Sequence, residues 1–332
     1  MKAAVVGSGA WGTALAVRLC KNGHDTVLWT RTEEKAEQLR RTRRNPRLPD
    51  VPLPETLRVS PEYSCVSGCP LVVIACPSFP MRRVCEGIAP YLEADAVLVS
   101  VTKGIEEGTL LRMSQVIRQE TGLEAVALTG PSHAEEVAAD IPTACVAACP
   151  DRKRAEFVQD AFMAESFRVY TSPDTVGAEL GGALKNVIAL CAGVTDGLGY
   201  GDNTKAMLMT RGLTEIARLG LSLGASKDTF AGLAGVGDLI VTCTSIHSRN
   251  RRAGILIGKG IPPEAAMEQV GAVVEGYYAT KSAWELCQRQ GVDMPILRAA
   301  YGVLYEGKTP AEVVRTLLHR SKKAESEDAG WK

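Results

Sequence analysis

The chain has 332 residues, of which 45% are hydrophobic and 23% are charged, as is usual for soluble globular proteins with room for two domains. Its 38 Lys and Arg balance 38 Asp and Glu, so net charge favours neither nucleic acid nor an anionic membrane as a partner. No apolar run approaches the ~20 residues of a membrane span, and the N-terminus shows no signal-peptide pattern. We therefore expect a cytoplasmic protein.

The ten cysteines are scattered along the chain and lack metal-binding spacing. Cys65-x3-Cys69 and Cys145-x3-Cys149 do not match zinc patterns, and the four histidines are not clustered. The sequence therefore predicts reduced, mostly buried thiols and no metal site.

A glycine-rich turn lies close to the N-terminus. An apolar strand pattern at residues 3–6 runs directly into Gly7-Ser8-Gly9-Ala10-Trp11-Gly12, and a helix and a second strand follow. In this setting Gly7 permits the tight turn, Gly9 lets a pyrophosphate reach the backbone, and Gly12 packs the helix on the strand. The N–H groups at the helix start then favour phosphate. The pattern predicts a dinucleotide-binding site.

The end of the second strand bears on the choice of cofactor. An NAD site usually has Asp or Glu about 20 residues past the glycines, but here the chain reads Thr30-Arg31-Thr32, with Glu33 only afterwards. An arginine suits the 2′-phosphate of NADP, so NADPH is favoured. NADH stays the alternative, because Arg31 could begin a solvated helix whose Glu33 reaches a ribose.

The remainder of the first half alternates strands and helices. The basic run 40–44 indicates a solvated helix end, and the proline-rich stretch 45–54 indicates a loop. Continuous apolar runs, typical of buried parallel strands, occupy residues 71–75 and 96–100, and residues 125–128 and 144–148 are expected to form further strands. The alternation predicts a doubly wound, Rossmann-like α/β domain over residues 1–173.

Beyond Pro173 the strand patterns stop and helical periodicity begins. Residues 174–192 predict one helix, and Thr204 to Leu223 are apolar nearly all round, which indicates a helix buried inside its domain. Further helices are expected over residues 275–290, 296–305 and 310–318. The sequence thus predicts an all-α domain over 174–320 and a disordered, charged tail over 321–332.

Lys185 lies in the middle of a charge-poor helix, away from its apolar stripe. Gly181 and Gly182 precede it, and each glycine inside a helix costs roughly 1 kcal/mol relative to alanine, so a close approach usually requires them. The long side chain leans back over the preceding turn. Lys185 would then lie across the space that the two glycines leave empty. A planar ligand with a carbonyl group could bind in that space. The alternative is that the glycines only let another helix pack closely and that Lys185 is solvated.

Other polar groups follow buried strands or begin helices. Lys103, after a strand, would lie at the sheet edge where ligands bind, and Gly130-Pro131-Ser132 could present backbone N–H groups. His133 is a candidate acid, although a lone histidine is as often structural. Asp238 could orient a lysine side chain, or it could be an ordinary turn residue. The segment Ser248-Arg249-Asn250 could bind a phosphate, or it could be the solvated start of a helix. Together these groups suggest hydride transfer beside a lysine.

With these segments in view, the chain resembles the bacterial-type NAD(P)-dependent glycerol-3-phosphate dehydrogenases. The matching segments run in the family's order from residue 7 to residue 276. They are Gly7-Ser8-Gly9-Ala10-Trp11-Gly12-Thr13-Ala14, Thr102-Lys103-Gly104-Ile105-Glu106, Gly130-Pro131-Ser132, Gly182-Ala183-Leu184-Lys185-Asn186, Asn203-Thr204-Lys205-Ala206, Gly235-Val236-Gly237-Asp238-Leu239, Ser248-Arg249-Asn250 and Val274-Glu275-Gly276.

The resemblance implies an α/β Rossmann-like domain followed by an all-α domain of the 6-phosphogluconate dehydrogenase-like kind. The implied reaction is the reversible reduction of dihydroxyacetone phosphate to sn-glycerol 3-phosphate, which supplies glycerophospholipid synthesis. The helical domain of the family often dimerises, so a homodimer is one assembly to expect.

The resemblance and the glycine motif together give the expected site residues. The expected catalytic residues are Lys185 as the acid/base, Lys103 and Asp238. The expected cofactor contacts are Gly7, Gly9, Ala10, Trp11, Gly12, Arg31, Lys103, Ala134, Arg249, Val273 and Glu275. The expected substrate contacts are Lys103, Gly130, Ser132, Lys185, Asp238, Ser248, Arg249 and Asn250.

The same residues suggest a mechanism. Hydride would reach C2 of the ketone while the Lys185 ammonium protonates the developing alkoxide, and the like charge of Lys103 would lower the pKa of Lys185. Two rival functions are a related hydroxyacid dehydrogenase of the 6-phosphogluconate or 3-hydroxyisobutyrate type and a nucleotide-sensing module without turnover. The Ser248-Arg249-Asn250 segment and the Asp238 loop argue against the first. The second leaves Lys185, Lys103 and Asp238 unexplained.

Overall fold

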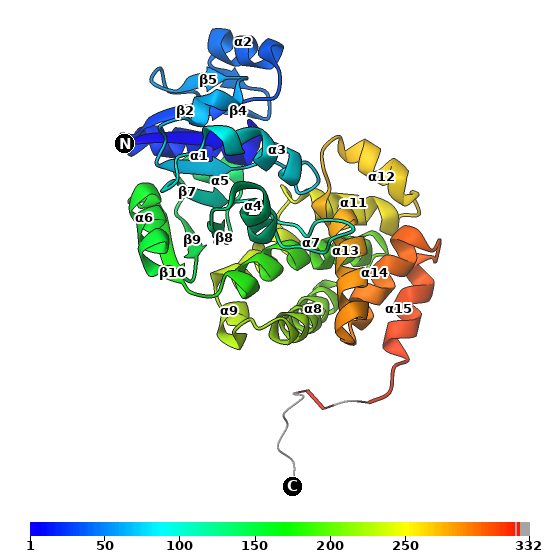
Figure 1. Cartoon of the computed structure of the whole chain (residues 1–332). Helices are drawn as coiled ribbons and strands as arrows, with labels where there is room; N and C mark the ends of the chain where they lie inside the picture. Colours follow the sequence, from blue (N-terminus) through cyan, green and yellow to red (C-terminus); the bar gives the residue numbers. More distant parts are fainter. Residues whose placement is uncertain (323, 326–332) are drawn as a thin grey trace.

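The computed structural model of the chain describes residues 1–322, 324 and 325. Figure 1 shows an α/β half built from the first part of the chain and a half made of helices alone from the second. This arrangement confirms the predicted fold class, a Rossmann-like α/β domain followed by an all-α domain. The tail expected to be disordered, 321–332, falls mostly outside the described residues.

One eight-stranded sheet forms the frame of the first half, in the order β10-β9-β8-β7-β6-β1-β2-β5. Neighbouring strands are parallel except β8 and β9, which are antiparallel. The four residues of β6 and of β7 are all buried, which explains their continuous apolar sequences. The strands are β1 (Lys2–Val6), β2 (Asp25–Trp29), β5 (Arg58–Ser60), β6 (Leu71–Ile74), β7 (Val97–Ser100), β8 (Ala125–Thr129), β9 (Thr143–Ala148) and β10 (Phe167–Ser172).

Helices cover both faces of this sheet. Successive β1 side chains point to opposite faces, so Val5 joins the core beneath α1, α5 and α6, whereas Val6 joins the core beneath α3 and α4. The sheet is therefore doubly wound, as predicted. The helices are α1 (Ala10–Lys21), α2 (Glu33–Thr42), α3 (Met81–Ile88), α4 (Met113–Thr121), α5 (Ala134–Ala138) and α6 (Arg152–Phe162), with short 3₁₀ turns η1 (Tyr63–Val66) and η2 (Ala89–Tyr91).

Two details of the first half differ from the sequence-based expectation. The stretch 45–54, expected to be a loop, contributes to an antiparallel hairpin of β3 (Arg44–Asn45) and β4 (Leu48–Pro52). The strands β5 and β10 were not predicted. Both lie at the ends of the strand order, where one edge is unpaired and polar side chains alternate with buried ones, so no continuous apolar run marks them.

The second half is organised around α7 (Thr175–Gly197), nearly all of whose residues are buried. Asp174 caps its start by accepting a hydrogen bond from Gly177 N at 2.8 Å. The surrounding elements are α8 (Asp202–Ser222), α9 (Lys227–Ala231), the π-helical turn η3 (Leu233–Gly237), α10 (Asp238–Thr244), α11 (Arg249–Gly258), α12 (Pro263–Val270), α13 (Glu275–Gln290), α14 (Pro295–Tyr305) and α15 (Pro310–Leu318). In the part of the chain that the structure describes, no helix is long and apolar enough to cross a membrane.

The expectation that 204–223 form a fully buried helix is wrong. Helix α8 buries one stripe that includes Leu208, Ile216 and Leu219, while Met207 and Leu221 are 49% and 48% exposed. Apolar composition shows that a helix can be buried, but the number of neighbouring elements decides how many faces are covered. The helix buried on all sides is α7, which packs against α8, α10, α11 and α13.

Candidate active site

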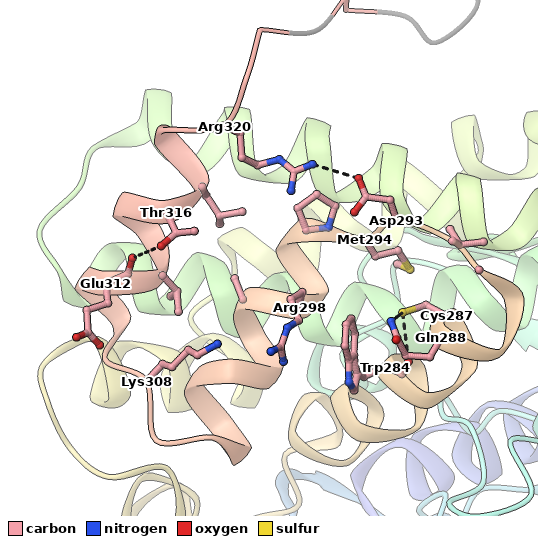
Figure 2. A pocket seen from close by; sticks show the side chains of 16 residues that line it. Trp284, Cys287, Gln288, Asp293, Met294, Arg298, Lys308, Glu312, Thr316 and Arg320 are labelled. Atoms are coloured by element: carbon pink, nitrogen blue, oxygen red, sulfur yellow. Dashed lines mark hydrogen bonds and ion pairs between the residues drawn. The ribbon is translucent and has the colours of Figure 1, made fainter.

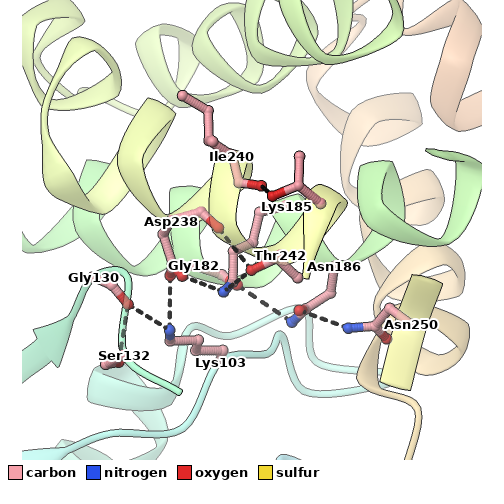
Figure 3. Close-up of polar contacts among 11 residues, drawn as sticks. Lys103, Gly130, Ser132, Gly182, Lys185, Asn186, Asp238, Ile240, Thr242 and Asn250 are labelled. Carbon is pink, nitrogen blue, oxygen red and sulfur yellow. Dashed lines mark hydrogen bonds and ion pairs between the residues drawn. The ribbon is translucent and has the colours of Figure 1, made fainter. Parts of the chain in front are cut away.

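Polar side chains from both halves meet beside α7. Figure 3 shows Lys185 on α7 and Lys103, which follows β7, approaching Asp238 at the start of α10. Lys103 is held there because the loop that carries it inserts Ile105 into the core of the helical half. Three segments far apart in the sequence therefore form one polar cluster.

Asp238 bridges the two lysines. Its Oδ1 accepts a hydrogen bond from Lys185 Nζ, and its Oδ2 accepts one from Lys103 Nζ at 2.7 Å. Lys185 Nζ also donates to Thr242 Oγ1 at 2.6 Å. Asp238 is only 1% exposed and Lys185 only 6%, so the carboxylate is enclosed between two ammonium groups. Such an arrangement fixes the direction in which Lys185 presents its protons.

Burial is the largest influence on Lys185 and lowers its pKa to about 7. The negative charge of Asp238 acts in the opposite direction, and the positive charge of Lys103 adds to the lowering. The effect expected of Lys103 thus has the predicted sign, but it is secondary to burial. A lysine that titrates near neutral pH can both give and take a proton, as acid–base catalysis requires.

The two glycines before Lys185 do not form an open floor. A Cβ on Gly181 would lie 2.4 Å from Ala234 O, and one on Gly182 would lie 2.9 Å from Thr129 Oγ1. The side chain of Lys103 also occupies the space beside Gly182. The glycines therefore let η3 and Lys103 approach α7, and neither a ligand floor nor a solvated lysine describes this part of the helix.

The turn after β8 supports Lys103. Gly130 has a φ of +145°, and a Cβ there would lie 3.0 Å from Ala144 O, so glycine suits both the conformation and the space. Its carbonyl accepts hydrogen bonds from Lys103 Nζ at 3.1 Å and Ser132 Oγ at 3.0 Å. Ala134, two residues further on, begins α5.

His133 occupies the position before α5, where its side chain makes no capping hydrogen bond, and it lies outside the lysine–aspartate cluster. Its Nε2 is buried and has no hydrogen-bond partner among the described residues. Burial, and next the charge of Lys185, lowers the pKa of His133, so the imidazole is neutral at pH 7. No contact assigns it the role of an acid.

Residues 248–250 form the start of α11, and their side chains differ in the hydrogen bonds that they make. Ser248 caps the helix by accepting a hydrogen bond from Arg251 N at 3.2 Å. Asn250 accepts from Gly276 N at 2.8 Å and donates to Asn186 Oδ1 at 2.9 Å, which leaves one amide hydrogen for a ligand. Arg249 is exposed and makes no hydrogen bond or ion pair with the described residues. A free guanidinium at a helix N-terminus suits an anion.

The glycine motif has the geometry of a dinucleotide turn. Gly7 has a φ of +128°, and a Cβ there would lie 2.6 Å from Ala75 O, while a Cβ on Gly12 would lie 2.0 Å from Gly7 O. A Cβ on Gly9 would meet nothing within 4 Å, so the backbone there is open to a ligand. Ala10 and the partly buried Trp11 begin α1 directly after it.

Three cations gather beside this turn. Lys35 Nζ donates to Ser8 O at 3.1 Å, and its pKa is lowered by burial and then by the charges of Arg47 and Arg31. Sequence reasoning identified Arg31 but missed Lys35 and Arg47. Arg47 belongs to the hairpin that was expected to be a loop, and Lys35 was one charge on a solvated helix. Glu33 forms an ion pair with Arg40 at 2.6 Å, which does not favour the ribose contact considered for it.

The two halves are also joined at the start of α13. The Glu275 carboxylate accepts hydrogen bonds from Ser78 Oγ at 2.8 Å and Ser78 N at 3.4 Å. Val273, expected beside the cofactor, lies half-buried just before this helix. Sequence reasoning missed Ser78, which shows no motif of its own.

Sequence reasoning also missed Thr242 and Asn186 in the lysine cluster. Thr242 follows Asp238 by four residues, so the two share one face of α10, and this spacing was a readable signal. Asn186 adjoins Lys185 in the sequence, but its link to Asn250 depends on the packing of α7 against α11.

A separate cavity of about 830 Å³ lies among α13, α14 and α15. Figure 2 shows Trp284, Arg298 and Arg320 on its lining. Arg298 lies over the Trp284 ring with 4.9 Å between guanidinium carbon and ring centroid, and Arg320 pairs with Asp293 at 3.1 Å. The cavity contains none of the predicted site residues.

Comparison with known proteins gives a consistent result for both halves. The sequence model of the NAD-dependent glycerol-3-phosphate dehydrogenase N-terminus matches residues 2–155, and that of the C-terminus of the same family matches residues 174–315.

Individual relatives match over nearly the full length. A glycerol-3-phosphate dehydrogenase [NAD(P)+] from Thermoanaerobacter sp. (strain X514) is 52% identical, with 98% of this chain and 99% of the relative covered. Another from Pelotomaculum thermopropionicum is 54% identical, with 98% and 95% covered. The crystal structure of glycerol-3-phosphate dehydrogenase from Coxiella burnetii superposes with a TM-score of 0.93 at 35% identity, covering 96% of this chain and 99% of that one.

Proposed function

Because the chain belongs to the NAD-dependent glycerol-3-phosphate dehydrogenase family, we propose that Lys185 is the acid/base of its reaction, with Lys103 and Asp238 as its catalytic partners. The reaction is the reversible, NAD(P)H-dependent reduction of dihydroxyacetone phosphate to sn-glycerol 3-phosphate. Its product supplies glycerophospholipid synthesis. The observation that carries the role of Lys185 is its burial against Asp238, which Lys103 shares.

The nicotinamide cofactor, when bound, supplies hydride to C2 of the ketone. The Lys185 ammonium donates a proton to the oxygen on C2, so one hydride and one proton convert the ketone into the alcohol, and the reverse reaction returns the proton to neutral Lys185. A pKa of about 7 suits both directions. Asp238 orients the ammonium group, and the positive charge of Lys103 stabilises the developing alkoxide.

The substrate phosphate is assigned to Arg249 at the start of α11. A free guanidinium can form two parallel hydrogen bonds to a phosphate, and the helix N-terminus adds N–H groups and a favourable dipole. Asn250 has one amide hydrogen left for the same anion. Gly130, Ser132 and Ser248 border this space in the proposal.

NADPH is the proposed cofactor, with Gly7, Gly9, Ala10, Trp11 and Gly12 around its pyrophosphate. The open space over Gly9 supports this placement, and the three cations Arg31, Lys35 and Arg47 support a 2′-phosphate beside it. The other proposed cofactor contacts are Lys103, Ala134, Arg249, Val273 and Glu275.

The test is to follow NADPH absorbance with dihydroxyacetone phosphate and with unphosphorylated dihydroxyacetone. We expect rapid oxidation with the phosphate ester and slow oxidation without it. A Lys185→Met variant keeps the buried stem and leaves Asp238 paired with Lys103, so it should bind NADPH and lose about 10²–10⁴-fold in kcat. Full kcat in that variant would remove Lys185 from the role.

A homodimer in the cytoplasm completes the proposal. The outer face of α8, where Met207 and Leu221 are about half exposed, supports a second copy as the partner, and the ten unpaired cysteines support a reducing compartment. Light scattering during size-exclusion chromatography should give twice the chain mass, and Met207→Lys should give monomers. A wild-type monomer would remove the dimer from the proposal.

A further inference from the structure

Three helices are tied together by Asp196, in the last turn of α7. Arg251, in the first turn of α11, directs Nε and Nη2 at Asp196 Oδ2, each at 2.8 Å. Lys205, in the first turn of α8, lies 2.8 Å from Asp196 Oδ1. The three side chains are 15–19% exposed, so this ion-pair network is largely shielded from solvent. We refer to Asp196, Lys205 and Arg251 as the Asp196 brace.

The brace lies beside an unusually close helix contact. A Cβ on Gly254 of α11 would lie 2.0 Å from Leu190 O of α7, and one on Gly193 of α7 would lie 2.1 Å from Arg251 O. Here the two backbones touch, and beside the glycines Leu190 and Val194 of α7 share a hydrophobic cluster with Ala253 and Ile257 of α11. The glycines set how closely the helices approach, and the side-chain contacts beside them set the position of one helix along the other. Asn250 and Asn186 link the two helices at one point, and the charged pair between Asp196 and Arg251 adds a second polar link about three turns away along α7.

Register matters because each helix carries one end of the proposed site. Arg251 is two residues past Arg249, the proposed phosphate ligand. Lys185 is eleven residues before Asp196 on α7, which is about three turns, so both lie on the same side of that helix. The substrate joins its phosphate to its C2 oxygen through a few covalent bonds, so the spacing between Arg249 and Lys185 must match that length. A misplacement of about 1 Å can cost ~10²-fold in rate.

We propose that Asp196, Lys205 and Arg251 are positioning residues that set the register between Arg249 and Lys185. This inference rests on the proposed function of Arg249 and Lys185. It also gives a role to Lys205 of the segment Asn203-Thr204-Lys205-Ala206, which the mechanism does not use. The brace touches neither substrate nor cofactor in this proposal and acts through the placement of α11.

The experiment compares Asp196→Asn and Arg251→Gln with Arg252→Gln. Arg252 adjoins Arg251 but is exposed, so its variant removes the same charge from the same turn without touching the brace. For each protein, kcat and KM are measured with dihydroxyacetone phosphate and with dihydroxyacetone, and NADPH affinity is measured by fluorescence titration. Thermal unfolding is recorded in parallel.

Both brace variants should lose about ten- to a hundredfold in kcat/KM for the phosphate ester and keep their low kcat/KM for dihydroxyacetone, which Arg249 does not hold. The Arg252→Gln variant should match the wild type in all of these constants. In the brace variants NADPH affinity should change by less than kcat/KM for the phosphate ester, because Arg249 is only one of the proposed cofactor contacts. The kcat/KM of the double variant Asp196→Asn/Arg251→Gln for the phosphate ester should be no lower than that of the more impaired single variant, because the two changes remove the same contact.

Three outcomes would overturn the brace. Equal losses on both ketones would indicate general damage to the fold, and an equal loss in Arg252→Gln would indicate charge attraction instead of register. A lower KM for the phosphate ester in Asp196→Asn would mean that the network restrains cations that bind phosphate better when released. A wild type without preference for the phosphate ester would instead refute the proposed function, and this is measured before any variant.

Discussion

At the scale of single residues, the proposed chemistry depends on one buried carboxylate shared by two ammonium groups. Removing Lys185 from water favours its neutral form, and Asp238 opposes this by its charge and by hydrogen bonding. Lys103 lies on the other oxygen of the same carboxylate, so it also takes part of the attraction that would otherwise hold the proton on Lys185. In the proposed mechanism the balance of the three groups sets the pH range in which the enzyme works.

The two reaction directions should therefore show opposite pH dependence around neutrality. Ketone reduction needs protonated Lys185, so kcat/KM for dihydroxyacetone phosphate should fall as pH rises through about 7. Oxidation of glycerol 3-phosphate needs the neutral form and should rise over the same range. In Lys103→Met the like charge is gone, so the pKa of Lys185 should increase and both profiles should move to higher pH. If the pH profiles of Lys103→Met match those of the wild type, the charge of Lys103 does not influence the pKa of Lys185.

Cofactor preference is also a residue-scale property. We expect the wild type to prefer NADPH to NADH, and Arg31→Ala, Lys35→Met or Arg47→Ala to reduce this preference by weakening NADPH alone. A charge-assisted hydrogen bond to phosphate contributes roughly 1.5–3 kcal/mol, which corresponds to a tenfold change or more. Steady-state KM values for both cofactors provide the measurement. Equal KM values in the wild type would show that these cations do not select NADPH.

At the scale of elements, buried polar groups and glycines define how helices meet. Glu215 of α8 accepts hydrogen bonds from the backbone N–H groups of Ile296 and Leu297 at the start of α14, which satisfies donors that every helix start leaves free. The contact between α7 and α11 instead uses glycines, because larger side chains would separate backbones that touch. The first contact joins two helices that carry none of the proposed site residues, and the second joins the helices that carry Lys185 and Arg249.

Glu215 should make stability depend on pH. Burial raises its pKa from 4.5 to about 7, so its contribution to stability is fully present below about pH 4.5 and is lost as pH rises through 7. Glu215→Gln keeps an oxygen acceptor for the helix start but cannot ionise. Chemical denaturation of both proteins between pH 4.5 and 7 gives their free energies of unfolding. As pH rises over this range, the wild type should lose stability relative to Glu215→Gln. A constant difference would mean that Glu215 does not titrate there.

The glycine contact gives a second prediction at this scale. Gly254→Ala places a Cβ 2.0 Å from Leu190 O, and overpacking of this kind typically costs about 1–3 kcal/mol. Gly201→Ala is the matched control, since its Cβ would meet nothing within 4 Å. Denaturation midpoints should fall for the first variant and stay near wild type for the second. An unchanged midpoint in Gly254→Ala would show that α7 and α11 can separate freely.

At the scale of the whole molecule, the proposed site exists only where the two halves meet. The α/β half contributes Lys103, and the helical half contributes Lys185, Asp238 and Arg249. The loop after β7 anchors Ile105 in the helical core, and Ser78 hydrogen-bonds Glu275 across the junction. In the proposal neither half alone holds the hydride donor, the proton donor and the phosphate ligand, so the relative placement of the halves would be part of catalysis.

The sequence by itself determined the features that arise from neighbouring residues. The glycine turn follows from the conformations that Gly7 permits, the central strands follow from continuous apolar runs, and the bounds of α13 and α15 match the predicted ranges because caps and periodicity are local. The sequence also marked Lys185 as one lysine within a charge-poor helix, but it did not predict that the side chain is buried.

Only the tertiary structure decided which distant residues meet. It filled the space beside Gly181 and Gly182 with η3 and Lys103, exposed the outer face of α8, and placed Arg47 near Arg31 through an unexpected hairpin. The pairing of Asp196 with Arg251 likewise joins residues 55 positions apart. Periodicity and spacing report what each segment can bury, whereas the side chain that occupies each space depends on how all segments pack together, and no local pattern encodes that choice.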